Sequence, residues 1–204
     1  MKKVTLILAL LLSTFVAKAQ YEKGFKLEID LGAAQFSNWS ALSVFDDGAA
    51  NQTYGLINSD RLFFGYRGGK GLYGGIGIGY ETGNAPQYQE EFMHINIIAE
   101  IRQYYKISNR FEFVDGVEFG YIVGTNRFEF SDKDYDVDHN GWMCALNLGF
   151  NFKIVEDQYI GVKASWPCLG RMNKPELPSD VTATANTRDG LYGYRIGLTW
   201  GIAF

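Results

Sequence analysis

The sequence predicts an all-β fold: an eight-stranded antiparallel up-and-down transmembrane β-barrel with short periplasmic turns and four longer extracellular loops. From Tyr192 to Phe204 every even-numbered residue is bulky and apolar, whereas the odd-numbered residues are small or polar. This period of two is typical of a strand with one apolar face, and the stretch is long enough to cross a bilayer at a tilt. Beyond residue 19 no apolar run is long enough for a membrane helix, so a chain that enters a membrane must close into a barrel.

The start of the chain has the composition of a secretory signal peptide. Lysines follow Met1, a mostly apolar stretch runs over 4–16, and Ala17-Lys18-Ala19 is an A-x-A cleavage site. The apolar stretch is too short for a membrane anchor. We therefore predict a signal peptide over 1–19, Sec-type export with cleavage near Ala19, and a barrel domain over 20–204. Three of the 19 basic residues lie in the leader, which leaves 16 against 23 acidic residues and excludes a nucleic-acid partner.

The alternation recurs along the rest of the chain. It predicts strands over 25–36, 60–67, 72–82, 92–105, 111–123, 141–153, 159–167 and 190–204. Short turns are expected at 68–71, 106–110 and 154–158, and longer, more polar loops at 37–59, 83–91, 124–140 and 168–189. An even strand number with short connections on one side and long ones on the other is typical of outer-membrane barrels.

Alternation alone does not say which face points inward, and a soluble barrel of the lipocalin kind would enclose its apolar face. Glycines crowd the polar face, as a narrow filled lumen requires. Aromatic residues gather near the strand ends, which resembles the two girdles of a membrane barrel. One set is Phe25, Tyr105, Phe111, Phe152, Tyr159 and Phe204, and the other is Tyr80, Tyr121, Trp142, Trp166 and Tyr192. The apolar face is therefore expected to face lipid. Asp115 is a misfit on that face, and a bulge and an interface position are both open for it.

The strand number, the loop asymmetry and the terminal Phe204 resemble the small OmpA/OmpX-type outer-membrane barrels. The segment 149–158 and the A-x-A-Gln start resemble the "outer membrane protein beta-barrel domain" proteins of Bacteroidota. Phe204 resembles the C-terminal insertion signal of such barrels. The resemblance implies an outer membrane of a Gram-negative-type envelope, with lipid and the barrel insertion machinery as partners. It implies no catalytic residue.

The polar face predicts a network of charges in the lumen. The interior of an eight-stranded barrel is only wide enough to be filled by side chains, so charges there must pair. The expected members are Glu28, Asp30, Glu100, Arg102, Glu112, Glu118, Lys153, Lys163 and Arg195, beside Lys26. A salt-bridged plug and a proton or ion path are both open, and the width of the lumen favours the plug.

Cys144 and Cys168 are the only cysteines. If the turn centred on Glu156 sets the register, the numbers of facing residues add up to 312, and the two cysteines face each other at the outer rim. A disulfide and two free thiols are both open.

Two motifs could carry chemistry in the third long loop and beside it. From Asp136 the chain matches D-x-D-x-N-G, so Asp136, Asp138 and Asn140 are candidate calcium ligands. Asn147 stands where the bidentate Glu is needed, which favours a solvated acidic loop without an ion. His94 and His139 are the candidates for an enzyme, yet no His-x-Ser or Gly-x-Ser-x-Gly motif accompanies them. His94 is interpreted as a polar lumen residue.

Aromatic and amide residues in the loops suit a contact surface: Trp39, Phe45, Asn51, Tyr54, Tyr88, Phe92, Phe128 and Tyr135. We therefore expect a non-enzymatic outer-membrane barrel with a closed, salt-bridged lumen. It would act through its extracellular loops or as an accessory subunit of an envelope complex. An outer-membrane lipid-modifying hydrolase and a narrow pore are the alternatives. Calcium in the third loop is the one cofactor that the sequence suggests.

Overall fold

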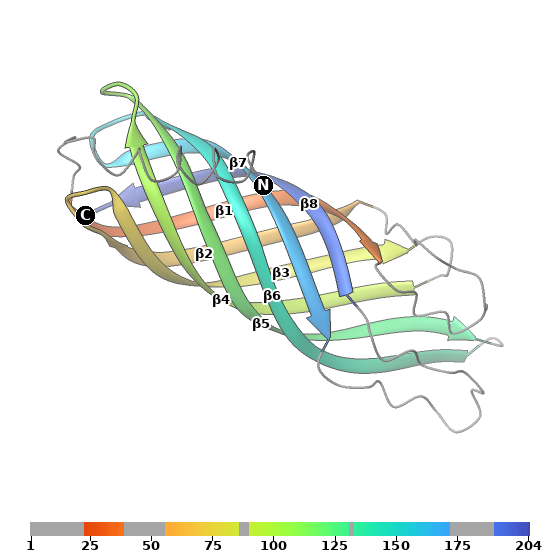
Figure 1. Ribbon diagram of the computed structural model, residues 1–204. Helices are drawn as coiled ribbons and strands as arrows, with labels where there is room; N and C mark the ends of the chain where they lie inside the picture. The colour runs from red at the N-terminus through yellow and green to blue at the C-terminus, as the bar shows by residue number, and fades with distance from the viewer. Residues whose placement is uncertain (1–22, 39–55, 86–89, 131–132, 172–189) are drawn as a thin grey trace, which may run out of the picture.

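The computed structural model describes residues 23–38, 56–85, 90–130, 133–171 and 190–204. They form eight antiparallel strands that close into one barrel in chain order, with β8 paired to β1 (Figure 1). The strands are β1 (Gly24–Asn38), β2 (Ile57–Arg67), β3 (Leu72–Ala85), β4 (Glu90–Lys106), β5 (Phe111–Phe130), β6 (Lys133–Lys153), β7 (Gln158–Arg171) and β8 (Gly190–Ala203). The predicted fold class is confirmed. The described residues include no helix that is long and apolar enough to cross a membrane.

The three short turns lie where the sequence predicts them. They connect β2 to β3, β4 to β5 and β6 to β7. In the first, Gly71 has a φ of 82°, a backbone conformation that favours glycine. The Gly71 carbonyl accepts a 3.0 Å hydrogen bond from the Tyr104 amide on β4. The predicted signal peptide, 1–19, lies outside the described residues, as do the aromatic and amide residues of the predicted loops from Trp39 to Tyr88.

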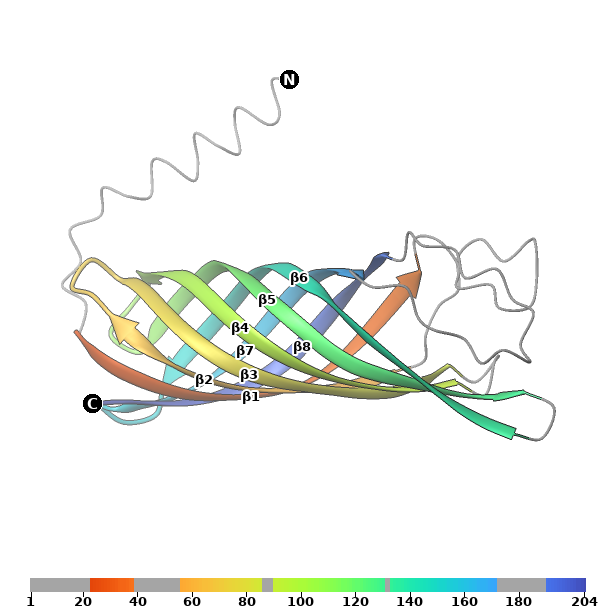
Figure 2. The ribbon, with the colours of Figure 1, turned by 90° about the horizontal axis from the view of Figure 1, so that it is seen from below.

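The third predicted loop, 124–140, is wrong. β5 continues to Phe130 and β6 begins at Lys133, so this segment is a long β-hairpin with register from Val123↔Asn140 to Phe130↔Lys133. The hairpin projects beyond the other strands in Figure 2. The period of two continues into this segment, where Phe128, Phe130, Tyr135 and Val137 alternate with charged residues. The density of acidic residues favours a loop, although the backbone hydrogen bonds form a ladder.

The apolar face points outward around the whole barrel. β2 alternates strictly between buried and exposed side chains from Ile57 to Arg67. Large outward apolar residues occur on every strand and include Ile76 and Leu198, each 68% exposed, and Ile97, 64% exposed. A closed barrel with such an apolar belt has the surface that a bilayer covers, and the soluble lipocalin arrangement is excluded.

Most of the predicted girdle aromatics lie on this outer face. Near the turn end of the barrel, Phe111 and Phe152 have ring centroids 4.9 Å apart, and Phe25 stacks on Phe64 at 5.5 Å. Tyr159 is the exception. Its side chain points into the barrel and is only 4% exposed, because it has the parity opposite to Ile160 and Val162. The girdle assignment of Tyr159 is therefore wrong.

Candidate functional site in the barrel lumen

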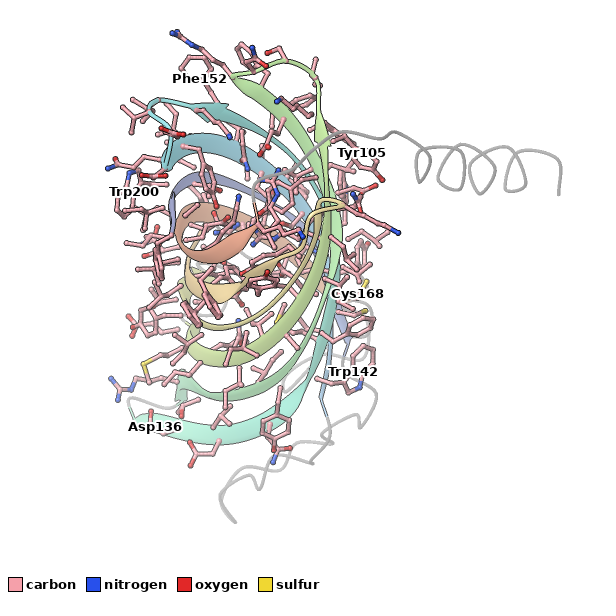
Figure 3. All side chains as sticks on the ribbon, turned by 90° about the vertical axis from the view of Figure 1, so that its left-hand side faces the viewer. Tyr105, Asp136, Trp142, Phe152, Cys168 and Trp200 are labelled. Carbon is pink, nitrogen blue, oxygen red and sulfur yellow. The ribbon has the colours of Figure 1, made fainter. Side chains whose placement is uncertain are left out.

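The lumen contains a charge-balanced set of buried ionic side chains. The buried acids are Glu28, Asp30, Glu81, Glu100, Glu112 and Glu118, and the buried bases are Lys26, Arg61, Arg67, Arg102, Lys163 and Arg195. Six carboxylates thus face six cations, although the whole chain carries a net charge of −4. Ionised groups removed from water are tolerated when they are paired and hydrogen-bonded. Figure 3 looks toward the turn end of the barrel and shows side chains filling its interior.

Arg195 and Asp30 form a two-pronged ion pair between the neighbouring strands β8 and β1. The guanidinium Nη1 and Nη2 donate to the two carboxylate oxygens at 3.0 and 2.9 Å. Arg195 also donates to the Ser59 carbonyl and hydroxyl on β2, at 2.7 and 2.9 Å. Lys163 on β7 brings its Nζ within 2.5 Å of Asp30 Oδ2. Four strands are joined by this one group of side chains.

A second group is centred on Arg102 of β4. Its Nη1 donates to Glu28 of β1 at 2.6 Å, and its Nη2 lies 2.5 Å from Glu100 on the same strand. The Tyr159 hydroxyl of β7 donates to Glu28 at 2.7 Å. Because β4 and β1 are not neighbours in the barrel, the Arg102–Glu28 bond crosses the lumen.

Two further arginines, Arg61 and Arg67, extend the network. Arg61 of β2 binds Glu81 of β3 at 3.2 Å and also Glu118 of β5. Arg67 of β2 binds Glu112 of β5 at 2.6 and 3.1 Å, again across the lumen. At this same end Lys26 Nζ lies over the Tyr104 and Tyr159 rings, 4.3 and 4.4 Å from their centroids.

An apolar cluster lies beside the ionic network. Its members are buried and point inward, for the most part in the half of the barrel away from the short turns: Ala34, Phe36, Ile57, Phe63, Ile98, Ile122, Met143 and Leu169. Phe63 connects this apolar cluster to the ionic network, because Lys163 Nζ and the Arg102 guanidinium lie 4.7 and 5.0 Å from its ring centroid. The glycines make this filling fit. A Cβ on Gly77 would clash with the Phe63 ring, and one on Gly32 would come within 2.6 Å of the Arg195 guanidinium.

The structure brings together eight of the nine predicted lumen residues as buried partners: Glu28, Asp30, Glu100, Arg102, Glu112, Glu118, Lys163 and Arg195. The ninth, Lys153, is half-buried at the turn end of the barrel. There it lines a small cavity of about 20 Å³ together with Lys26 and Arg67.

Sequence reasoning missed three members of the network: Arg61, Arg67 and Glu81. Glu81 follows the alternating glycines of β3, so its parity could have revealed it. Arg61 and Arg67 share a face with Phe63, and that aromatic residue hides the polar character of the face. His94 is buried, with its Nδ1 3.9 Å from Glu81 Oε2, as a polar lumen residue would be.

The two cysteines lie directly opposite each other. The predicted register of β6 and β7 is confirmed, and it pairs Cys144 with Cys168. Both thiols are free and half-buried on the outer side of the wall, where Figure 3 labels Cys168 and Trp142. A disulfide between them stays a prediction.

The candidate calcium ligands lie on a strand of the hairpin and not in a loop. Asp136, Asp138 and Asn140 pair with Arg127, Thr125 and Val123. Arg127 Nε donates to Asp136 at 2.9 Å, and the Thr125 hydroxyl donates to Asp138 at 2.7 Å. The hydrogen bond from Arg127 holds the pKa of Asp136 below its ordinary value. An extended strand does not wrap oxygens around an ion as a calcium loop does. Within the described part of the chain, no three His, Cys, Asp or Glu side chains gather as a metal site.

No protein-family model matches this sequence, and a search of curated proteins finds no relative. Solved structures with a similar fold include the outer membrane protein AlkL, determined by solid-state NMR in DMPC lipid bilayers. The TM-score is 0.58, and the sequences are 13% identical over 93% of this chain and 94% of that one. Neisserial surface protein A has a TM-score of 0.53 and 12% identity over 90% of this chain and 100% of that one. The outer membrane protein OprG from Pseudomonas aeruginosa has a TM-score of 0.51 and 12% identity, over 90% and 98%. The resemblance to the Bacteroidota proteins finds no support in these comparisons. The chain has the fold of the small eight-stranded outer-membrane barrels.

Proposed function

We propose that this chain is a non-enzymatic outer-membrane barrel whose lumen is closed and salt-bridged, and that it acts through its extracellular side or as an accessory subunit of an envelope complex. The observation that carries the proposal is the filled lumen. Several ion pairs cross it, among them Arg102 to Glu28 and Arg67 to Glu112, and an apolar cluster that includes Ile98 and Met143 lies beside the charged layer. A barrel blocked in this way offers its outer surfaces for function.

The outer-membrane location is supported by the outward apolar belt, by the closed barrel and by the likeness in fold to outer-membrane proteins. Export through the predicted signal peptide and recognition of Phe204 by the insertion machinery belong to this proposal. The network also supports the plug over the ion path, because its charges are equal in number and bind one another.

The β5–β6 hairpin supports a role in contact with another molecule. It carries an antiparallel pair of strands past the rest of the barrel, with exposed polar side chains such as Arg127 and Asp136 (Figure 2). Binding residues often lie on such projections, which a rigid scaffold positions. A hydrolase is less well supported, since His94 is buried beside Glu81 within the lumen.

A pull-down from the native envelope tests the contact role. In the test variant, residues 126–137 of the hairpin are replaced by Asn-Gly, a two-residue turn that suits a β-hairpin. Lys70→Ala, at an exposed turn on the opposite end, is the matched control. We expect envelope proteins to co-purify with the wild type and with Lys70→Ala and to be lost with the shortened hairpin. Identical capture by all three would contradict a role for the hairpin.

Planar-bilayer recording tests the closed lumen. The purified wild-type protein is expected to show no steady conductance, because buried ion pairs occupy the path. The triple substitution of Asp30, Lys163 and Arg195 by Ala removes one interlocked group and should introduce current. A steady wild-type conductance would favour the narrow pore instead.

A further inference from the structure

Asp115 is a carboxylate on the outer, apolar surface of the barrel. It is half-buried and lies between Phe113 and Val117 on the outward face of β5. Its register partners are Gln103 on β4 and Leu148 on β6. A charge in the apolar belt of a membrane protein is costly and usually marks a functional position.

The surroundings of Asp115 leave its charge without a cation. The Tyr105 hydroxyl donates to Asp115 Oδ2 at 3.2 Å. The neighbouring Gln103 amide is used elsewhere, since its Nε2 donates to the Lys70 and Tyr104 carbonyls at 2.9 and 3.2 Å. Among the residues that the structure describes, none forms an ion pair with Asp115.

A hollow of about 450 Å³ opens on the outer wall beside this carboxylate. Five strands contribute to it, and its apolar lining includes Leu72, Ile101, Val117, Leu146, Leu148 and Trp166. Asp115, Tyr105 and Gln103 lie on the side of the hollow nearer the short turns. Val117, Leu146 and Trp166 form the next row of the register toward the other end of the barrel.

The carboxylate, the basic residues and the apolar hollow together complement a zwitterionic phospholipid in the periplasmic leaflet whose ethanolamine folds back from the phosphate toward Asp115. Aromatic rings mark the interface, with Tyr105 and Phe113 5.7 Å apart and Phe113 and Phe150 5.2 Å apart. On the turn side of Asp115 are exposed basic residues, Lys70, Lys106 and Arg110, which suit a phosphate. An anionic group next to basic ones complements a zwitterionic headgroup, and the apolar hollow suits an acyl chain.

We propose that this outer hollow is a binding site for a phospholipid with a primary-amine headgroup, phosphatidylethanolamine, whose ammonium pairs with Asp115 and whose acyl chain lies over Val117 and Leu146. A primary ammonium donates hydrogen bonds to a carboxylate, whereas the quaternary ammonium of phosphatidylcholine has no N–H and an anionic headgroup is repelled. The inference rests on the membrane location proposed above.

Native mass spectrometry of the full chain in detergent, with equal amounts of phosphatidylethanolamine, phosphatidylcholine and phosphatidylglycerol, tests the site. We expect wild type to retain the ethanolamine lipid over the glycerol lipid by about tenfold or more, since charge-assisted hydrogen bonds are among the stronger ones. Asp115→Asn should lose this selectivity. Asp60→Asn, an outward carboxylate at the far end of β2, is the matched control and should keep it.

A second variant tests the acyl part of the site. Val117→Trp fills the hollow and should reduce retention of all three lipids while the barrel stays folded, as judged by its electrophoretic shift on heating. Equal retention of the three lipids by wild type, or undiminished selectivity in Asp115→Asn, would overturn the lipid site. A chain that is not a membrane barrel would instead retain no lipid of any class, so failure of the membrane location is distinguishable.

Discussion

At the scale of single residues, several buried charges of the lumen are held by more than one partner. Arg195 illustrates this, because its guanidinium contacts Asp30 and both the carbonyl and the hydroxyl of Ser59. Removing one partner from such a group leaves the others buried without compensation. Losing one residue of the network should therefore lower the free energy of unfolding by more than a single ion pair contributes.

Arg195→Met tests this interdependence. It deletes the cation and leaves Asp30 with Lys163 alone, so we expect a loss of about 3–5 kcal/mol in the free energy of unfolding. Urea unfolding of the refolded protein in micelles measures the change. Lys70→Met at an exposed turn is the control and should change the value by less than about 0.5 kcal/mol. Equal stability of Arg195→Met and wild type would show that the pairing is not structural.

The facing cysteines give a second expectation for single residues. Because Cys144 and Cys168 are direct cross-strand partners, mild oxidation should join them within one chain, with the loss of two hydrogen atoms in the intact mass. Cys144→Ser should abolish the change. Two thiols that stay fully open to alkylation after oxidation would speak against the bond.

At the scale of elements, the β5–β6 hairpin is held by its backbone pairing and by exposed polar contacts. The Arg127–Asp136 pair is more than half exposed on both sides, so it adds little to global stability. The pKa of Asp136 is lowered by the hydrogen bond from Arg127. The pairing is therefore complete above the ordinary carboxyl pKa and is lost as the pH falls through the lowered value in the folded chain.

Arg127→Gln should accordingly leave the unfolding of the barrel unchanged while it speeds amide hydrogen exchange in the hairpin. Exchange followed by mass spectrometry at neutral pH makes the comparison, with Lys106→Gln near a turn as the control. The wild-type hairpin should approach the exchange of the variant in acid, after correction for the intrinsic rate. A large fall in global stability would mean that the hairpin is coupled to the barrel wall.

The sequence predicts the elements that face lipid far better than those that do not. Strands such as β8 alternate along their whole length because one face meets the bilayer, and the turn around Glu156 sets the β6–β7 register correctly. The hairpin keeps the alternation over 127–130 and 134–138, but its many acidic residues favour a loop in the sequence analysis. The pairing of Arg67 with Glu112 depends on how β2 and β5 meet across the lumen, which no local pattern contains.

At the scale of the whole molecule, the barrel wall separates an apolar outer surface from a largely ionic lumen. Outward side chains form the apolar belt, and inward ones form a neutral ionic layer with an apolar layer beside it. Because side chains alternate along each strand, the same strand contributes residues to the outer apolar belt and to the lumen. The closed lumen and the membrane location are therefore two consequences of the same orientation.

The most direct test of this orientation is an accessibility scan along β4. Nitroxide labels are introduced one at a time by cysteine substitution from Ile95 to Ile101, in a background with Cys144→Ser and Cys168→Ser, and the protein is reconstituted in bilayers. Ile95, Ile97 and Ile101 are outward and exposed, whereas Asn96, Ile98 and Glu100 are buried. We predict collision with lipid-dissolved oxygen at the odd positions and protection from both oxygen and a water-soluble nickel chelate at the even ones. Odd positions open to the chelate and closed to oxygen would contradict the account.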